Sequence, residues 1–335
     1  MKRVMYVFYA LLFVEGLSII YIRTLRPQIY RTGLINQTIS NILAKSIAIY
    51  DRNTFKYLED NFNYPVTFDQ NGRLCNQLFE FASTIGIAQK NSLSPRLARW
   101  SPIRECFDIR ITDENTADGQ KVYFAKEEET FGPAYLKFEK KAFHIGRTFK
   151  KLKGNMQSWK YFSHVDEIVR KELNFRQKHI IAANKFLSSK KKGNSSSTYV
   201  SLQVRRTDFV KKYSSLINGI TLKYINSAMS AFLSTFTDVI FVVVSDDIAW
   251  CKNNINSTKY DIIYSEGHSA CQDLSILAHC NHSIITAGST FGWWGAYLAN
   301  GQATYYEKWL KHGHWNSIPF VEKDVFLPRW TILER

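Results

Sequence analysis

The carboxy-terminal half of the chain repeats one pattern, in which short apolar runs alternate with longer segments of helical spacing. The apolar, β-branched run at 239–244 is typical of a strand buried on both faces of a parallel sheet. The pattern predicts strands at 199–204, 239–244, 261–264, 283–286 and 303–306, and helices at 221–233, near 249–250, at 270–280 and at 291–300. Strands and helices alternating at this spacing predict right-handed crossovers and a doubly wound parallel sheet.

The segment before this half is less regular. A short strand is predicted at 65–68, followed by a turn at 69–72 and a helix that Asn76 can cap. From about 92 to 150 the pattern is hard to interpret, and the acidic run at 127–129 is most simply a solvated surface. A polar, basic stretch at 188–198 is the best candidate linker.

The amino terminus carries a candidate membrane anchor. Lys2 and Arg3 precede a mainly apolar run at 4–22 that is just long enough to cross a bilayer, although Glu15 interrupts it. A cleaved signal peptide is the alternative. We expect a single-pass type II protein of the Golgi membrane with a lumenal catalytic part. The predicted organisation is a tail at 1–3, an anchor at 4–22, a stem at 23–62, an amino-terminal lobe at 63–195 and a carboxy-terminal lobe at 196–335.

Composition and charge allow several kinds of partner. The chain has 335 residues and a formal net charge of +15, so acidic partners are favoured electrostatically. Nucleic acid, anionic lipid and a nucleotide diphosphate all fit that charge. The anchor argues against nucleic acid, and so does the spread of the basic residues. Aromatic residues reach 15%, which suits a sugar-handling protein, although dense core packing would look the same.

Glycosylation sequons and cysteines agree with a lumenal destination. The sequons begin at Asn36, Asn194, Asn256 and Asn281, and we expect Asn281 to be too buried to carry a glycan. The five cysteines show no CxxC metal spacing, and their odd number leaves at least one thiol free or paired between chains. One candidate bridge joins Cys251 and Cys280.

Polar clusters follow the predicted strands of the carboxy-terminal half. They are Arg205-Arg206, residues 245–247, residues 266–269 and Ser289-Thr290. In doubly wound sheets ligands bind at the carboxyl ends of the strands, so these clusters predict a binding site.

The residue types in these clusters suit an anionic nucleotide. Guanidinium groups make bidentate contacts with phosphate, although a salt bridge between one arginine and Asp208 is the structural alternative. Ser289 and Thr290 precede a helix whose exposed N–H groups can bind an anion, or they are ordinary caps. Asp273 can accept hydrogen bonds from a guanine edge or a ribose, or merely complement the helix dipole.

No D-x-D triplet, the motif by which many nucleotide-sugar transferases hold a divalent metal, occurs in the chain. Its absence suggests that arginines and helix N–H groups neutralise the leaving nucleotide. Asp246 and Asp247 are adjacent, so in an extended geometry they would face opposite ways and hold one metal poorly. No metal is therefore expected.

Several segments resemble the galactoside α-1,2-fucosyltransferase family, in the family's order. Residues 72–79 (GRLCNQLF) are similar to its G-R-L-G-N-Q-[ML]-F stretch, and 157–162 (QSWKYF) to its Q-S-x-K-Y-F segment. Residues 203–208 (QVRRTD) match H-x-R-R-x-D except at the histidine. The blocks at 249–251 and 280–293 resemble its remaining carboxy-terminal blocks. The resemblance spans roughly residues 64–310.

This resemblance implies a fold, a reaction and a set of site residues. The fold would be α/β, with two facing Rossmann-like domains of the GT-B type. The reaction would transfer L-fucose from GDP-fucose to O2 of a terminal galactose on a glycan acceptor, inverting the anomeric centre without a metal. Arg206 would bind the β-phosphate with support from Arg205. The rest of the implied donor site is Asn76, Gln203, Asp247, Asp273, Ser289, Thr290 and Phe291.

Two departures from the family pattern leave alternatives open. Gln203 replaces a histidine, and Cys75 replaces a glycine that could require positive φ. A catalytically silent GDP-sugar-binding relative, or a fucosyltransferase of another linkage or acceptor, therefore remains an alternative. The general base is not visible in the sequence. Asp208 is a catalytic candidate, although a structural partnership with the arginines competes with that role.

Overall fold

The computed structural model describes residues 64–111, 127–130, 136–189, 197–211, 214–215, 217–218, 220–286, 288–311 and 320–333. The chain divides into two compact units, Met1–Asn61 and Phe62–Arg335, and all described residues belong to the second. The predicted tail, anchor and stem, and the predicted boundary between the lobes at 195/196, lie outside the described residues. Among the helices that the structure describes, none combines the length and the apolar character that crossing a bilayer requires.

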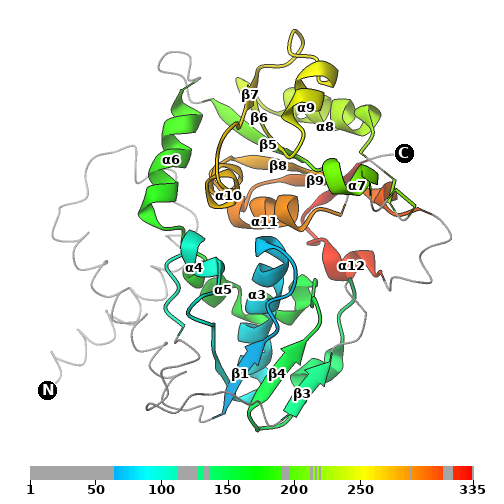
Figure 1. The fold of residues 1–335 in the computed structure, drawn as a ribbon. Helices are drawn as coiled ribbons and strands as arrows, with labels where there is room; N and C mark the ends of the chain where they lie inside the picture. Colours follow the sequence, from blue (N-terminus) through cyan, green and yellow to red (C-terminus); the bar gives the residue numbers. More distant parts are fainter. Residues whose placement is uncertain are drawn as a thin grey trace, which may run out of the picture. The chain divides into compact units, whose positions relative to one another are not determined.

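A four-stranded parallel sheet with the order β2-β1-β4-β3 forms the first part of the second unit (Figure 1). Its strands are β1 (Pro65–Phe68), β2 (Ser94–Pro95), β3 (Glu127–Thr130) and β4 (Lys150–Lys153). The strand predicted at 65–68 is confirmed. The acidic run at 127–129 lies in β3, where Glu128 is exposed and forms an ion pair with Lys153 at 2.5 Å.

Helix α3 (Leu74–Asn91) is the main helix beside this sheet, and most of its residues are buried. At Gly86 a Cβ atom would lie 2.0 Å from the carbonyl oxygen of Tyr161, so the close approach of these two backbones requires glycine. The prediction that Asn76 caps this helix is wrong. The N-cap is Arg73, in extended conformation, and Asn76 is the third helical residue.

The second sheet is parallel and six-stranded, with the order β10-β9-β8-β5-β6-β7. Its strands are β5 (Thr198–Val204), β6 (Val239–Ser245), β7 (Ile262–Tyr264), β8 (His282–Ile285), β9 (Ala303–Tyr306) and β10 (Thr331–Leu333). The five predicted strands are confirmed to within about one residue at each end. The edge strand β10 was not predicted, because its side chains are mostly exposed and leave no buried apolar run.

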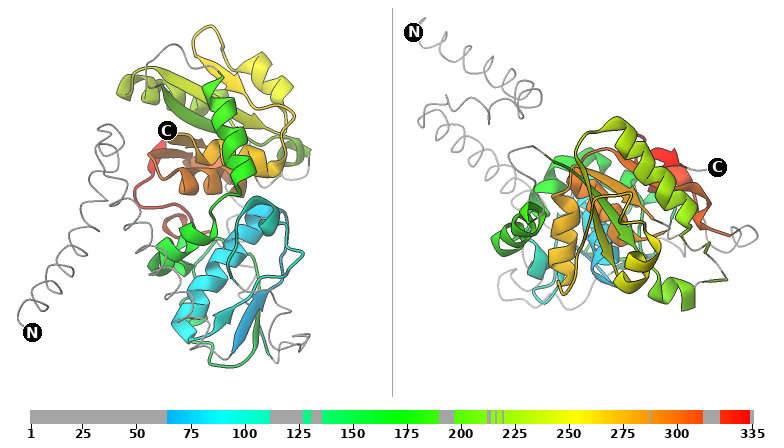
Figure 2. Two further views of the ribbon diagram at one scale, coloured as in Figure 1. Left: turned by 90° about the vertical axis from the view of Figure 1, so that its left-hand side faces the viewer. Right: turned by 90° about the horizontal axis from the view of Figure 1, so that it is seen from above.

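Helices cover both faces of this sheet, as the doubly wound prediction requires (Figures 1 and 2). On one face, Val200, Leu202, Phe241 and Val243 pack with buried residues of α8 (Leu222–Thr235) and α9 (Ile248–Asn254). On the other face, Ile240 and Val242 pack with residues of two further helices, α6 (Gln177–Ser188) and α10 (Ala270–Ala278). Successive strand residues point to opposite faces, which explains this division.

The remaining elements are α4 (Ile103–Cys106), α5 (Asp166–Glu172), α7 (Thr207–Lys211), α11 (Thr290–Ala299), α12 (Glu322–Val325), η1 (Lys140–Phe143), η2 (Trp159–Tyr161), η3 (Ser163–Val165) and η4 (Glu307–Trp309).

Helix α12, in the carboxy-terminal segment, contacts residues that lie near each of the two sheets. Lys160 Nζ lies 2.6 Å from a carboxylate oxygen of Asp324, which belongs to α12. The Trp293 indole N–H donates to the carbonyl of Val325 at 2.8 Å. Residues near both sheets therefore hold α12.

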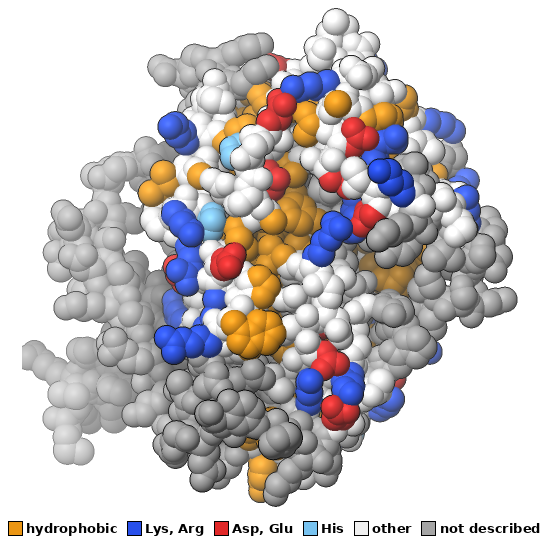
Figure 3. Space-filling view, viewed as in Figure 1, with side chains coloured by type: hydrophobic (Ala, Val, Ile, Leu, Met, Phe, Trp, Pro, Cys, Tyr) orange, Lys and Arg blue, Asp and Glu red, His pale blue; other side chains and the backbone are white. Residues whose placement is uncertain are grey.

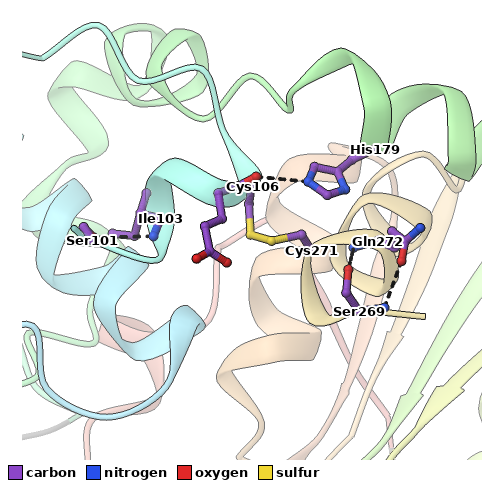
Figure 4. Close-up of a disulfide and its surroundings, with 8 residues drawn as sticks. Ser101, Ile103, Cys106, His179, Ser269, Cys271 and Gln272 are labelled. Atoms are coloured by element: carbon purple, nitrogen blue, oxygen red, sulfur yellow. Dashed lines mark hydrogen bonds between the residues drawn. A yellow bond between two sulfur atoms is a disulfide. The ribbon is translucent and has the colours of Figure 1, made fainter. Parts of the chain in front are cut away.

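A disulfide joins Cys106, at the end of α4, to Cys271 in the first turn of α10 (Figure 4). The bridge predicted between Cys251 and Cys280 is wrong, and both thiols are free and buried. Cys251 packs with the residues on one face of the second sheet and Cys280 with those on the other. The strands lie between the two sulfur atoms, so this pair cannot bond.

The expectation that Asn281 is too buried for a glycan is also wrong, because this residue is exposed. Its side-chain oxygen accepts a hydrogen bond from the backbone N–H of Tyr199 at 2.8 Å. Asn256 is exposed as well, and its side-chain oxygen accepts from the backbone and hydroxyl of Thr258. The sequons at Asn36 and Asn194 lie outside the described residues.

Candidate active site

The predicted polar clusters lie at the carboxyl ends of four neighbouring strands. In sheet order, Ser289 and Thr290 follow β8, Arg205 and Arg206 follow β5, residues 246–247 follow β6, and residues 266–269 follow β7. Three strand spacings separate β8 from β7, so the row spans about 14 Å. The chain reverses its direction of travel across the sheet between β5 and β8, which is the position where doubly wound folds bind ligands.

Arg205 is held in an ion-pair cluster. Its Nε donates to Asp208 Oδ1 at 2.8 Å and its Nη2 donates to Asp208 Oδ2. Arg73 Nη2 lies 3.6 Å from the same Oδ2. Hydrogen bonding from Arg205, with the charges of Arg205 and Arg73, holds the pKa of Asp208 below its usual value. Such a carboxylate is a weak base, so the geometry fits the structural partnership better than a catalytic one.

Arg206 is oriented by different neighbours. Its Nε donates to Asp247 Oδ2 at 3.3 Å, and the centre of its guanidinium lies 3.9 Å from the centroid of the Trp250 ring. Asp247 caps α9 by accepting from the backbone N–H of Trp250 at 3.1 Å. The two terminal nitrogens of Arg206 have no hydrogen-bond partner among the described residues. Arg206 therefore presents four oriented N–H donors.

Two buried polar side chains near the switch between β5 and β8 each carry an oxygen that has no hydrogen-bond partner among the described residues. Gln203 is 6% exposed and its Oε1 has no partner in the described part of the chain. Ser289, the N-cap of α11, is 2% exposed, and its hydroxyl neither caps the helix nor meets another described group. Both groups therefore keep hydrogen-bonding capacity that a polar ligand could use.

Asn76 and Thr290 connect the two sheets' helices at the same place. The Thr290 hydroxyl donates to Asn76 Oδ1 at 2.9 Å, and the Gln157 amide lies 3.4 Å from the same oxygen. Thr290 is the first residue of α11 and Asn76 lies in the first turn of α3. The structure thus brings Asn76 to the amino terminus of α11, beside Ser289.

Asp273 and Phe291 complete the predicted set. Asp273 Oδ1 accepts from the Ser265 hydroxyl at 2.6 Å, and burial raises the pKa of this carboxyl. It belongs to the β7 end of the row, away from the contacts of Arg206. Phe291 is partly buried in the first turn of α11. The ligand contacts predicted for all these residues stay predictions.

Cys75, which departs from the family pattern, fits its position without strain. It is a helical residue in the first turn of α3 and does not have positive φ. The residues with positive φ in the turn before this helix are Gln70, at 56°, and Gly72, at 73°. Burial raises the pKa of the Cys75 thiol, so it is neutral at physiological pH. The concern that a Cβ at this position would distort the turn does not apply.

A pocket lies between α3, α11 and the segment near α12. Its lining is mainly aromatic and apolar, with a few polar groups, and consists of Phe79, Leu136, Gln157, Ile285, Gly288, Ser289, Thr290, Trp293, Trp309, Val325 and Phe326. Figure 3 shows apolar surface in the middle of the face that carries α10 and α11, with basic and acidic side chains around it. Apolar walls with a few convergent polar groups are the usual composition of a small-molecule site.

The two adjacent aspartates that follow β6 accept hydrogen bonds from different groups. Asp246 accepts from the backbone N–H groups of Arg206 and Thr207, whereas Asp247 accepts from the Arg206 guanidinium. Among the described residues, no group of three or more His, Cys, Asp and Glu side chains is arranged to hold a metal ion.

Comparison with known proteins identifies the family. The family model described as glycosyl transferase family 11 matches residues 28–334. The chain belongs to this family. It is therefore a glycosyltransferase, and its similarity to the galactoside α-1,2-fucosyltransferases is confirmed.

Two curated relatives illustrate this similarity. The cattle (Bos taurus) galactoside 2-alpha-L-fucosyltransferase SEC1 is 29% identical over 275 residues, which cover 79% of this chain and 73% of the relative. The cattle galactoside alpha-(1,2)-fucosyltransferase 2 is 30% identical over 276 residues, covering 79% and 77%. Among solved structures, the apo form of POFUT1 matches with a TM-score of 0.52 at 13% identity, covering 72% of this chain and 97% of that one. The parallel-sheet α/β fold is therefore shared.

Sequence reasoning missed the residues that orient the predicted ones. Trp250 was expected only in a short helix and in a family block, and nothing in its local pattern indicates that it stacks on Arg206. Gln157 was likewise noted without a role. Both contacts join segments far apart in the chain, which sequence spacing does not reveal.

Proposed function

We propose that this protein transfers L-fucose from GDP-fucose to O2 of a terminal galactose on a glycan, with inversion at the anomeric carbon and without a metal ion. The curated relatives, which carry galactoside α-1,2-fucosyltransferase names, support the donor and the acceptor. The observation that carries the proposal in the structure is Arg206, whose terminal nitrogens are oriented but have no hydrogen-bond partner in the described part of the chain.

Arg206 would neutralise the leaving diphosphate. A guanidinium held on one side by Asp247 and stacked on Trp250 needs little reorganisation to meet a phosphate. Its remaining N–H groups suit bidentate contact with the β-phosphate. Charge developing on the departing GDP would be stabilised by these donors, which is the task that a metal performs in other transferases.

The amino terminus of α11 would supply the rest of the phosphate site. Its first N–H groups have no intrahelical acceptor, and the helix dipole favours an anion there. The Ser289 hydroxyl, which is buried and has no partner among the residues that the structure describes, can donate to a phosphate oxygen. The carboxamide of Gln203 lies at the neighbouring strand end. Asn76 is also near this site, because its side-chain oxygen accepts a hydrogen bond from the hydroxyl of Thr290, the residue after Ser289.

In the transfer step, the galactose O2 forms a bond to the anomeric carbon of fucose while the bond from that carbon to the β-phosphate oxygen breaks. The bonding electrons leave with GDP, and the proton of the galactose hydroxyl passes to a base or to water. Attack from the face opposite the leaving group inverts the configuration. The lowered pKa of Asp208 makes that carboxylate a poor acceptor for this proton, so we assign it to the support of Arg205.

We further propose that the two sheets belong to two facing Rossmann-like domains of the GT-B type. The second sheet would bind the donor, and the part around the first sheet would contribute Asn76 and accept the glycan. We also propose a signal-anchored, lumenal Golgi protein carrying N-linked glycans. The bridge between Cys106 and Cys271 supports an oxidising compartment, since structural disulfides are rare in the cytosol.

The test is fucose transfer by the full-length chain with GDP-fucose, excess EDTA and a panel of β-galactoside acceptors. Product linkage and anomeric configuration are read by NMR. We expect transfer to galactose O2, inverted relative to the donor, at a rate that EDTA does not change.

Three results would contradict parts of the proposal. Activity lost in EDTA and restored by a divalent ion would overturn metal independence. A different linkage would overturn the acceptor assignment. GDP binding without transfer to any galactoside would favour a catalytically silent relative.

A further inference from the structure

Ser265, His268 and Asp273 form a hydrogen-bonded cluster after strand β7. The Ser265 hydroxyl lies 2.6 Å from Asp273 Oδ1 and 2.7 Å from His268 Nδ1. The imidazole Nδ1 and the carboxylate oxygen lie 3.9 Å apart. Ser265 is 4% exposed, and the side chains of His268 and Asp273 are 25% and 22% exposed. The cluster is thus mostly buried.

The serine has a single proton, and this fixes the roles in the cluster. An ionised carboxylate only accepts, so the Ser265 hydroxyl donates to Asp273. It must then accept from His268, which carries its proton on Nδ1. His268 thus donates a hydrogen bond to Ser265, and Ser265 donates one to Asp273. Phe186 of α6 meets the imidazole edge-on, with the ring centres 5.4 Å apart, and limits its rotation.

Stabilising the amino terminus of α10 does not explain the position of Asp273. That terminus already has a complete capping box, in which Ser269 and Gln272 satisfy each other's backbone N–H groups (Figure 4). The Asp273 side chain turns instead toward Ser265. Its second oxygen, Oδ2, has no hydrogen-bond partner among the described residues. This oxygen therefore remains able to accept hydrogen bonds from a ligand.

We propose that Ser265 and His268 are positioning residues that set the base specificity of the donor site. By holding Oδ1, they orient Asp273 so that Oδ2 accepts from the N1–H and the 2-amino group of guanine. This inference rests on the proposed use of a guanosine-diphosphate donor. Its new content is that the discrimination between guanine and other purines depends on Ser265 and His268. Neither of these residues touches the base.

The position of the cluster agrees with this assignment. It lies at the β7 end of the row of strand ends, whereas Arg206 and Ser289 lie at β5 and β8. A nucleoside diphosphate whose phosphates lie near Arg206 would extend along the strand ends, and its base would reach the end of β7. The separation, about two strand spacings or roughly 10 Å, is on the scale of the nucleoside.

The test measures binding of GDP, IDP and ADP to the full-length protein by calorimetry. IDP lacks the 2-amino group and ADP lacks N1–H, so the GDP-to-IDP ratio reports the contact to the amino group. The variants are Ser265→Ala, His268→Ala and His268→Asn, whose side-chain amide can replace the Nδ1 donor. His279→Ala is the matched control, since His279 lies at the other end of α10 and bonds within that helix.

The wild type should prefer GDP to IDP by roughly tenfold, the effect of one hydrogen bond to a charged group. In Ser265→Ala and His268→Ala this preference should fall to about twofold, mainly through weaker GDP binding. His268→Asn and His279→Ala should keep it.

Two results would overturn the inference alone. These are a wild type that binds GDP and IDP equally, and Ser265→Ala and His268→Ala variants that weaken both nucleotides by the same factor. A wild type that binds no GDP would instead contradict the proposed function, and the inference with it.

Discussion

Arg205 and Arg206 are adjacent in the chain, yet their surroundings differ. Arg205 makes a two-point contact with Asp208, and Arg73 lies beside the same carboxylate. Arg206 makes one hydrogen bond to Asp247 and stacks on Trp250, which leaves its terminal nitrogens unpaired among the described residues. A guanidinium that already donates two hydrogen bonds to a carboxylate has a structural role. One that is held only by its Nε and its flat face remains available to a ligand.

The largest expected effect is that of Arg206→Ala. Removing a preorganised donor to the leaving group should lower the rate of fucose transfer by about a thousandfold. The free energy of unfolding should change by less than about 1 kcal/mol, because the ion pair lost with Asp247 is partly exposed. Initial rates and urea unfolding measure the two quantities.

Arg206→Lys is the matched control for charge. It keeps the positive charge but lacks the planar fork, so it should recover only a small part of the activity. Full activity in Arg206→Lys would show that orientation of the fork does not matter.

The next largest effect is on the free energy of unfolding, when Asp208, the partner of Arg205, is changed. Asp208→Asn should lower the free energy of unfolding at pH 7 by about 2 kcal/mol, since hydrogen bonds to a charged group are lost. The folded-state pKa of Asp208 is lowered, so the carboxylate's contribution is present above the ordinary aspartate pKa and disappears as pH falls below it. The difference between wild type and variant should stay constant from pH 7 to 5 and shrink toward pH 3.

Urea unfolding across this pH range provides the measurement. A difference that grows as the solution is acidified would contradict the ion-pair assignment. A variant as stable as the wild type at pH 7 would do the same.

A smaller effect is expected at Trp250, which contacts Arg206 only through its ring. Trp250→Leu removes the stacking and should weaken GDP-fucose binding by about three- to tenfold, the range of a partly desolvated cation–π contact. The change should appear in the donor KM. Trp250→Phe keeps an aromatic face and should lose less. Equal losses in the two variants would mean that packing, and not the π-face, is responsible.

The smallest effect should come from Asp247→Asn. Asparagine can still cap α9 and accept from Arg206, but without a charge, so GDP affinity should fall by about two- to fivefold. Asp246→Asn is the comparison, because Asp246 accepts from the backbone of Arg206 and not from its guanidinium. If Asp246→Asn weakened GDP binding more, the orientation of Arg206 would depend on its backbone.

Five of the six strands of the second sheet could be predicted from sequence because they are largely buried, whereas the exposed edge strand β10 could not. Uninterrupted apolar runs such as 239–244 are visible without any knowledge of their neighbours. In the first sheet, β3 carries three glutamates and β2 has two residues, so neither shows a strand pattern. Their pairing depends on partners up to tens of residues away, such as β4 beside β3.

The site residues could be predicted as a group but not by their individual contacts. The rule that ligands bind at strand ends identifies Arg205, Arg206 and Ser289 together. Which arginine meets Asp208 depends on the direction of each side chain, and the bridge from Cys106 to Cys271 spans a sequence separation of 165 residues. Contacts of this kind follow from the packed structure and have no local signal.

The most direct test of this difference between the arginines is a comparison of GDP with guanosine as ligands of the wild type, Arg206→Ala and Arg205→Ala. Calorimetry gives the affinity gained from the two phosphates in each protein. We predict that Arg206→Ala loses most of this gain while binding guanosine normally, and that Arg205→Ala keeps the larger part of it. A phosphate contribution that survives in Arg206→Ala and disappears in Arg205→Ala would reverse the assignment and contradict the proposed site.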